Sequence, residues 1–280
     1  MRKPPDLLAW ALSNDRYSKE GADFSTTEIL KPPQITYLAE LHEAKDMPLY
    51  KSFMSLIGTG VHAALEGAAP EDAIVEQRFY WVFEIEGQQV ILGGKPDFVH
   101  DGLLNDYKCV LVAGRPKGDM PKEEHYWQGQ FNSWLAIKNG FNVDTACTEY
   151  VFRDWNYGQA QREEGYPQLP NQPMPVPLLP LDEIEARIVE RLTLHVRARM
   201  GHNHPCSDED RWKTPDQWAV KKPVNKRARR VFSDKAEALV NLKPGEITEF
   251  RPGRAVRCES WCSYSHVCPQ NTSNDNRHKD

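Results

Sequence analysis

Long apolar runs are missing from this chain, since no stretch approaches the ~18–20 apolar residues that a membrane-spanning helix needs. The apolar run near the amino terminus is short and follows two prolines, so we expect no signal peptide and a cytoplasmic location. A Gly-x4-Gly-Lys-[Ser/Thr] loop is absent, and no internal repeat is visible. Without that phosphate-binding loop, we expect no nucleotide-driven motor activity from the chain itself.

A surplus of basic residues is also missing. The 35 Lys and Arg residues are outnumbered by 40 Asp and Glu, which gives a net charge of −5. Taken as an average, that balance argues against a nucleic-acid partner. Wholesale disorder is excluded too, because 40% of the residues are apolar and 10% are aromatic. A chain of 280 residues can form one large domain or two modest ones.

Apolar periodicity predicts an α/β fold for the first half of the chain. Helical spacing covers residues 34–44, 50–67 and 122–139, and strand-like patterns cover 74–85, 89–99, 103–112 and 143–153. Turn residues separate the strands at Gly87 and at Asp101-Gly102. The Gly93-Gly94 pair indicates a bulge or a close approach of another backbone. The order of elements predicts a mixed central sheet flanked by helices.

Changes in composition predict five segments along the chain. We expect an irregular and partly helical segment over 1–49, a core over 50–155 and a proline-rich linker over 156–180. A helix over 181–200 then begins a small α+β module that reaches residue 270 and contains short strands over 218–222 and 227–232. A helix from Ser233 to about Asn241 follows these strands, and 271–280 is expected to be a disordered tail.

Two carboxylates and a lysine form the pattern that suggests chemistry. Asp97 lies near the end of one predicted strand, and Asp106 and Lys108 lie two residues apart on the next. Side chains two apart on a strand point to the same face, and the short turn brings Asp97 alongside. Converging carboxylates need a compensating cation, and oxygen ligands suit Mg²⁺ or Mn²⁺. A lysine beside that cation could orient water and offset charge on a phosphate.

Further polar residues flank this hairpin in a regular order. His62 and Glu66 lie four residues apart on the preceding helix, and Gln128 and Gln130 lie on the following one. With these residues included, the region 56–153 resembles a PD-(D/E)XK nuclease of the RecB-like type, as found in bacteriophage genomes. Position 132, where such nucleases have a tyrosine, is Asn132.

The resemblance implies hydrolysis of DNA phosphodiester bonds, as an exonuclease or end-processing enzyme in recombination or repair. It implies that His62, Asp97, Asp106 and the carbonyl of Tyr107 hold Mg²⁺ or Mn²⁺, with Lys108 positioning the attacking water and Gln128 orienting it. Glu66 could assist the metal or be an ordinary exposed residue, and Gln130 could replace Gln128 if the register slips. DNA is the implied partner, together with a recombination or helicase partner if unwinding is required.

Six cysteines in a reducing compartment suggest metal ligands rather than disulfides. Three of them, Cys258, Cys262 and Cys268, lie within eleven residues, and Cys206 in a polar loop is the best fourth ligand. Four thiolates would close a structural site and fasten the C-terminal module. RecB-like nucleases with a [4Fe–4S] cluster have a similar C-terminal triplet, so we favour that cluster, with Zn²⁺ as the alternative.

Basic residues gather in this same module despite the acidic average. Between Gln217 and Val231 the sequence has no acid and six basic residues that could contact a DNA backbone. These are Lys221, Lys222, Lys226, Arg227, Arg229 and Arg230. Two other functions stay open from the sequence: a non-catalytic DNA-binding protein with a degenerate nuclease core, and a metal-stapled scaffold protein.

Overall fold

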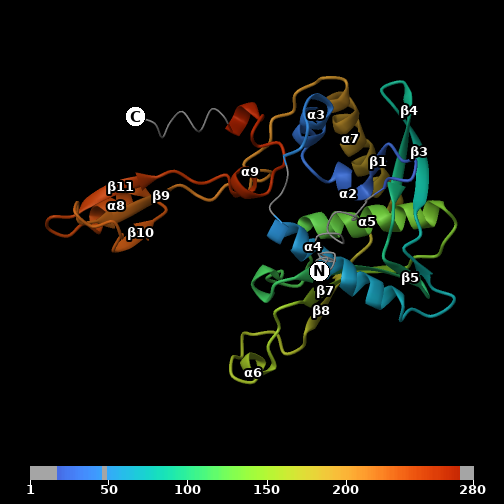
Figure 1. Cartoon of the computed structure of the whole chain (residues 1–280), viewed down its shortest axis with the longest axis horizontal. Coiled ribbons are helices and arrows are strands. Elements are labelled where there is room, and N and C mark those ends of the chain that lie inside the picture. The colour runs from blue at the N-terminus through green and yellow to red at the C-terminus, as the bar shows by residue number, and fades with distance from the viewer. Residues whose placement is uncertain (1–17, 46–48, 272–280) are drawn as a thin grey trace, which may run out of the picture. The chain divides into compact units, whose positions relative to one another are not determined.

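The computed structural model describes residues 18–45 and 49–271, which form two compact units (Figure 1). Within the described residues, the first unit contains 18–31 and 49–200, and the second contains 32–45 and 201–271. The first unit carries two mixed β-sheets with helices packed on them, so the α/β prediction is confirmed at that level. Among the described residues, no helix is both long and apolar enough to cross a membrane.

A five-stranded sheet organises the first unit, in the strand order β2-β5-β6-β7-β8. Strands β6 and β7 are parallel, and the other neighbouring pairs are antiparallel. The strands are β2 (Ile74–Val75), β5 (Phe98–His100), β6 (Leu103–Val110), β7 (Thr145–Phe152) and β8 (Asn171–Val176). Asp101 and Gly102 form the β5–β6 turn with positive φ angles of 48° and 76°, as their sequence predicts.

A second sheet of three strands has the order β1-β4-β3. Its strands are β1 (Phe24–Ser25), β3 (Phe79–Ile85) and β4 (Gln88–Gly94), with the β3–β4 turn at Glu86 and Gly87. The two long strands expected over 74–85 and 89–99 are therefore each divided between two sheets. The chain crosses from one sheet to the other twice, at residues 76–78 and 95–97.

Among the described residues of the first unit, six helical segments accompany these sheets. They are α2 (Thr26–Ile29), α4 (Leu49–Glu66), a 3₁₀ turn (Val112–Gly114), α5 (Glu123–Lys138), α6 (Tyr157–Ala160) and α7 (Leu181–Arg199). Helix α5 contacts both sheets, and Phe131, Trp134 and Leu135 on it are fully buried in the main apolar core. Helix α4 packs on β6. The helices expected over 50–67, 122–139 and 181–200 are confirmed.

The proline-rich segment 156–180 is not the linker that its composition predicts. It contains α6 and β8, and β8 extends the central sheet by pairing with β7 from Ala146 to Val151. Proline lacks an N–H donor, yet it is tolerated on an edge strand such as β8. Helix α7 also belongs to the first unit, so this unit extends past the boundary that the sequence predicts at residue 155.

The second unit combines α3 (Pro33–Leu41) with the C-terminal segment. Its three-stranded antiparallel sheet has the order β10-β9-β11 and carries one short helix, followed by another helix near the cysteines. These elements are β9 (Gln217–Lys221), β10 (Arg230–Phe232), α8 (Lys235–Val240), β11 (Ile247–Arg251) and α9 (Val256–Ser260). Asp234, rather than Ser233, caps α8 by accepting a hydrogen bond from the Glu237 N–H. The expected disordered tail lies outside the described residues, apart from Asn271.

Candidate active site

Asp97 lies at the second crossing between the sheets, immediately before β5. Its Oδ2 accepts a hydrogen bond of 2.7 Å from the backbone N–H of Tyr107 on β6. This bond fixes the carboxylate beside the neighbouring strand, where the tight β5–β6 turn has brought Asp106 and Tyr107. The predicted convergence of the two strands therefore occurs.

His62 approaches the same point from the last part of α4. Its Nδ1 lies 3.4 Å from Oδ1 of Asp97, and its Nε2 lies 3.1 Å from the backbone carbonyl oxygen of Tyr107. The neighbouring carboxylates of Asp97 and then Glu76 raise the pKa of His62 to about 10. His62, Asp97 and the Tyr107 carbonyl thus come together as the sequence predicts.

Glu76 belongs to this group although the sequence analysis did not select it. Its Oε1 lies 3.9 Å from Nδ1 of His62, and its carboxylate forms an ion pair with Lys95. The neighbouring His62 imidazole, followed by the Lys95 ammonium, lowers the pKa of Glu76 to about 2. Ligand atoms of His62, Glu76 and Asp97 all lie within 4.8 Å of one another, which is the spacing of a metal-binding group.

The position of Glu76 follows from strand pairing. Ile74 pairs with Val99 and Val75 pairs with Phe98, so the same antiparallel register sets Glu76 opposite Asp97. Glu76 has a positive φ of 49°, an uncommon conformation for a residue with a side chain. The only sequence signal for Glu76 is that an acidic residue lies where the chain passes from one sheet to the other. The sequence analysis predicts one continuous strand over 74–85, so it does not show that this crossing exists.

Asp106 points to the same face of β6 as Lys108, because side chains two residues apart on a strand share a face. It is 1% exposed, forms an ion pair with Lys108, and accepts a 2.7 Å hydrogen bond on Oδ1 from Nε2 of Gln128. Burial raises the pKa of Asp106, and the Lys108 charge acts in the opposite sense. Asp106 is therefore adjacent to the His62 group without being one of its three clustered ligands.

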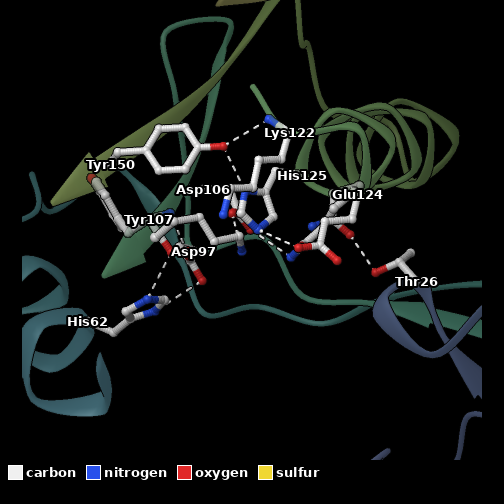
Figure 2. A network of polar contacts seen from close by, with 12 residues as sticks. Thr26, His62, Asp97, Asp106, Tyr107, Lys122, Glu124, His125 and Tyr150 are labelled. Atoms are coloured by element: carbon white, nitrogen blue, oxygen red, sulfur yellow. Dashed lines mark hydrogen bonds and ion pairs between the residues drawn. The ribbon is translucent and has the colours of Figure 1, made fainter. Parts of the chain in front are cut away.

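The two accessory candidates from the sequence separate clearly. Glu66 lines a cavity of about 620 Å³ together with His62, Glu76, Lys95, Lys108 and His125. Gln130 is fully buried and lies away from these residues, because its amide bonds the carbonyl of Pro177 at 2.7 Å and the N–H of Leu179 at 3.1 Å. Gln128 is therefore the glutamine that belongs to the candidate site, whereas Gln130 holds the segment before α7. Figure 2 shows the polar network of the site.

The cysteine group lies in the second unit. Burial raises the pKa of the Cys206 thiol to about 12, and Asp210 and then the thiols of Cys268, Cys258 and Cys262 act in the same direction. All four predicted ligands are therefore close enough to influence one another. The described residues contain no set of three cysteine sulfur atoms within 4.8 Å of one another.

The predicted DNA-contacting residues divide into two sets. Lys221 pairs with Glu249, Arg229 pairs with Glu246 at 2.7 Å, and the Arg230 guanidinium lies 4.8 Å from the ring centre of Phe232. Lys222, Lys226 and Arg227 are exposed in the β9–β10 loop and have no ion pair with the described residues. That loop also exposes 89% of Val224.

Comparison with known proteins bears on the fold. No family model matches the chain, and no match was found among curated proteins. A solved structure titled "Crystal structure of SSO0001" is similar over 95% of this chain and 95% of its own, with a TM-score of 0.52 and 16% sequence identity. At that identity the likeness indicates a shared overall fold and carries no information on activity.

Proposed function

We propose that the chain is a Mg²⁺- or Mn²⁺-dependent DNA nuclease of the PD-(D/E)XK, RecB-like type, acting as an exonuclease or end-processing enzyme. The observation that carries the proposal is the meeting of two groups along β6. His62, Glu76 and Asp97 cluster beside the backbone of Tyr107, and Lys108 and Gln128 hold Asp106 on the neighbouring position. We place this activity in the cytoplasm of a bacterial or phage-infected cell.

The donor set suits a hard divalent cation. One imidazole and two carboxylates offer ligand atoms within 4.8 Å of one another, and the Tyr107 carbonyl adds a further oxygen. We therefore revise the ligand set to His62, Glu76, Asp97 and Tyr107, with Asp106 as the adjacent carboxylate. The cation would supply Lewis acidity and a lowered pKa for attacking water.

The chain's own residues have distinct tasks in this proposal. Lys108 borders the cavity and is 20% exposed, so its ammonium can orient a water and offset negative charge on the phosphoryl oxygens. Gln128 fixes the buried Asp106 carboxylate, which in turn holds the Lys108 ammonium. Lys95 forms an ion pair with Glu76, and a cation bound by Glu76 would take the place of that ammonium group.

A nuclease assay with matched variants tests this assignment. Labelled linear and circular DNA would be incubated with Mn²⁺ or Mg²⁺ and wild type, Asp97→Asn, Lys108→Ala or the exposed control Lys117→Ala. We expect wild type and the control to cut DNA and the two site variants to lose at least ~100-fold in rate. Wild-type binding without cleavage would favour a non-catalytic DNA-binding protein, and equal cleavage by the site variants would exclude this site.

For the second unit, we propose a [4Fe–4S] cluster on Cys206, Cys258, Cys262 and Cys268 that fastens the fold. We favour this cluster over Zn²⁺ because the C-terminal triplet of cysteines resembles that of RecB-like nucleases that hold a [4Fe–4S] cluster. Anaerobic purification, visible absorbance and metal analysis distinguish the two, since a colourless zinc-containing protein would rule out the cluster.

We also propose that the β9–β10 loop contacts the DNA backbone through Lys222, Lys226 and Arg227. Their charges are not neutralised by described carboxylates, unlike those of Lys221 and Arg229. Replacing the three by Ser should weaken DNA binding and lower its salt dependence by about three counterions. Replacing Lys221 and Arg229 should change the salt dependence less. A recombination or helicase partner would supply any unwinding.

A further inference from the structure

His125 occupies the cavity wall without a role in the proposed chemistry. It lies in the first turn of α5, three residues before Gln128, so both side chains lie on the same face of the helix. Its imidazole is 12% exposed and lines the same cavity as Lys108. Figure 2 shows the ring between Tyr150 and Glu124, close to Asp106. Burial raises the pKa of Tyr150 to about 12, and the nearby charge of Asp106 acts in the same direction.

Hydrogen bonds fix the tautomer of this imidazole. The Tyr150 oxygen accepts a hydrogen bond of 3.1 Å from the backbone N–H of Lys122 and lies 2.7 Å from Nδ1 of His125. The hydroxyl proton therefore has Nδ1 as its acceptor. If Nδ1 carried the proton instead, the buried hydroxyl would have no hydrogen-bond acceptor among the described residues. Nδ1 is thus the acceptor, and the ring proton is on Nε2.

Nε2 is the atom that remains for a ligand. Its neighbour is Oε1 of Glu124 at 3.5 Å, and this carboxylate is 62% exposed, so solvent competes for it. Burial, followed by the charges of Lys108 and Lys122, lowers the pKa of His125 to about 3. Across the neutral pH range the group is therefore an uncharged N–H donor and does not exchange protons with a reactant.

We infer that His125 donates a hydrogen bond from Nε2–H to a phosphate oxygen of the DNA substrate, with Tyr150 as the positioning residue that sets its tautomer. This inference rests on the proposed nuclease function and adds a phosphate contact to it. A fixed neutral donor next to the Lys108 ammonium is suited to an oxygen on which negative charge develops. Gln128, one turn further along α5, donates its hydrogen bond to Asp106. On this face of α5, His125 would therefore contact the substrate and Gln128 would hold the carboxylate.

Steady-state cleavage of a single-stranded DNA substrate by four variants tests the inference. Glutamine can place an uncharged N–H near the position of Nε2, whereas alanine cannot. His125→Gln should therefore keep kcat within ~3-fold of wild type, and His125→Ala should lower kcat ~10- to 100-fold. Tyr150→Phe should lower kcat ~3- to 10-fold, and this loss should vanish in the His125→Gln background, where no tautomer needs to be set. His100→Gln, a histidine substitution at the β5–β6 hairpin, is the control.

Two results would overturn the inference. If His125→Gln is as slow as His125→Ala, the imidazole transfers protons or acts through its ring. If all four variants cleave at the wild-type rate per folded molecule, His125 only supports the structure. Mn²⁺ affinity, measured by electron paramagnetic resonance, should be the same in every variant, which separates a phosphate contact from loss of metal.

A second measurement judges the inference even if wild type cleaves nothing. In ¹⁵N-histidine-labelled protein, His125 should be the Nε2–H tautomer at pH 7, and Tyr150→Phe should change this tautomer. Adding a short single-stranded oligonucleotide with Ca²⁺ should shift the Nε2 resonance of His125 and leave that of His100 unchanged. An Nδ1–H tautomer, or no shift at saturating oligonucleotide, contradicts the inference. Failure of cleavage with the expected shift contradicts only the proposed function.

Discussion

Two glutamines on α5 should respond to mutation in opposite ways. Gln128 and Gln130 are two residues apart, so their side chains leave the helix on different sides. Gln128 bonds the Asp106 carboxylate in the candidate site, while Gln130 bonds the backbone before α7. We predict that Gln128→Ala lowers the rate of DNA cleavage with little change in stability. Gln130→Ala should lower stability and leave the rate per folded molecule nearly unchanged.

The size of the Gln130 effect can be worked from its contacts. Its fully buried side chain makes two hydrogen bonds, to the Pro177 carbonyl at 2.7 Å and from the Leu179 N–H at 3.1 Å. Each is worth about 1 kcal/mol net, and the lost methylene adds ~0.8 kcal/mol. The expected loss is therefore about 2–3 kcal/mol, which corresponds to a fall in Tm of roughly 5–10 °C for a unit of this size.

Calorimetry and urea unfolding measure this loss, and single-turnover cleavage measures the rate. For Gln128→Ala, we expect ~10-fold slower cleavage because Asp106 loses the donor that fixes it. The reasoning fails if Gln130→Ala melts like wild type, or if it slows cleavage as much as Gln128→Ala does. Both results together would mean that the two glutamines exchange roles, which is the register alternative that the sequence leaves open.

Three further predictions concern separate parts of the first unit. Burial lowers the pKa of His195 to about 4, so below pH ~6.5 the unfolded chain binds a proton that the folded chain does not. The free energy of unfolding should therefore fall by up to ~3 kcal/mol between pH ~6.5 and pH ~4. Urea titrations should show that His195→Gln flattens this pH dependence. Gly94→Ala should destabilise by ~1–3 kcal/mol because its Cβ would lie 2.5 Å from Leu135, whereas Gly60→Ala, with no atom within 4 Å, should not. Mn²⁺ must displace the His62 proton to bind this imidazole, since the pKa of His62 is about 10. Calorimetry at pH 7.5 in several buffers should therefore detect proton release on Mn²⁺ binding, and His62→Asn should lose it.

Local patterns predict much of this fold because they depend on neighbours in sequence. The helix over 50–67 and the Asp101-Gly102 turn are confirmed, since spacing and left-handed φ preferences are local properties. Residues 79–85 form a strand as the pattern over 74–85 predicts. Which sheet each part of this pattern joins depends on its partner strands, β5 for β2 and β4 for β3. Strand β1 is two residues long and gains its place by pairing with β4, so its own sequence carries little signal.

The proline-rich segment shows how composition can mislead. Six prolines from Pro167 to Pro180 suggest a linker, yet the last four residues of β8 alternate between exposed prolines and buried apolar residues. Met174 and Val176 are both 2% exposed, and they place β8 on the edge of the central sheet. Alternation, which is a property of strands, is the better guide there than the number of prolines.

The sequence predicts the candidate-site residues that lie close together along the chain. It does not predict Glu76, which joins the site only because the chain crosses between the two sheets. Asp97, Asp106 and Lys108 lie close in sequence, so a turn suffices to bring them together. Glu76 reaches Asp97 only because the chain changes sheets at 76–78 and again at 95–97, which sets the two carboxylates opposite each other. Gly94, the last residue before the second crossing, lets α5 pack closely on β4, since any larger residue would meet Leu135 and Asn132 of α5. The close approach that the sequence predicts at this glycine pair therefore lies next to the crossing that carries Asp97 to Glu76 and His62.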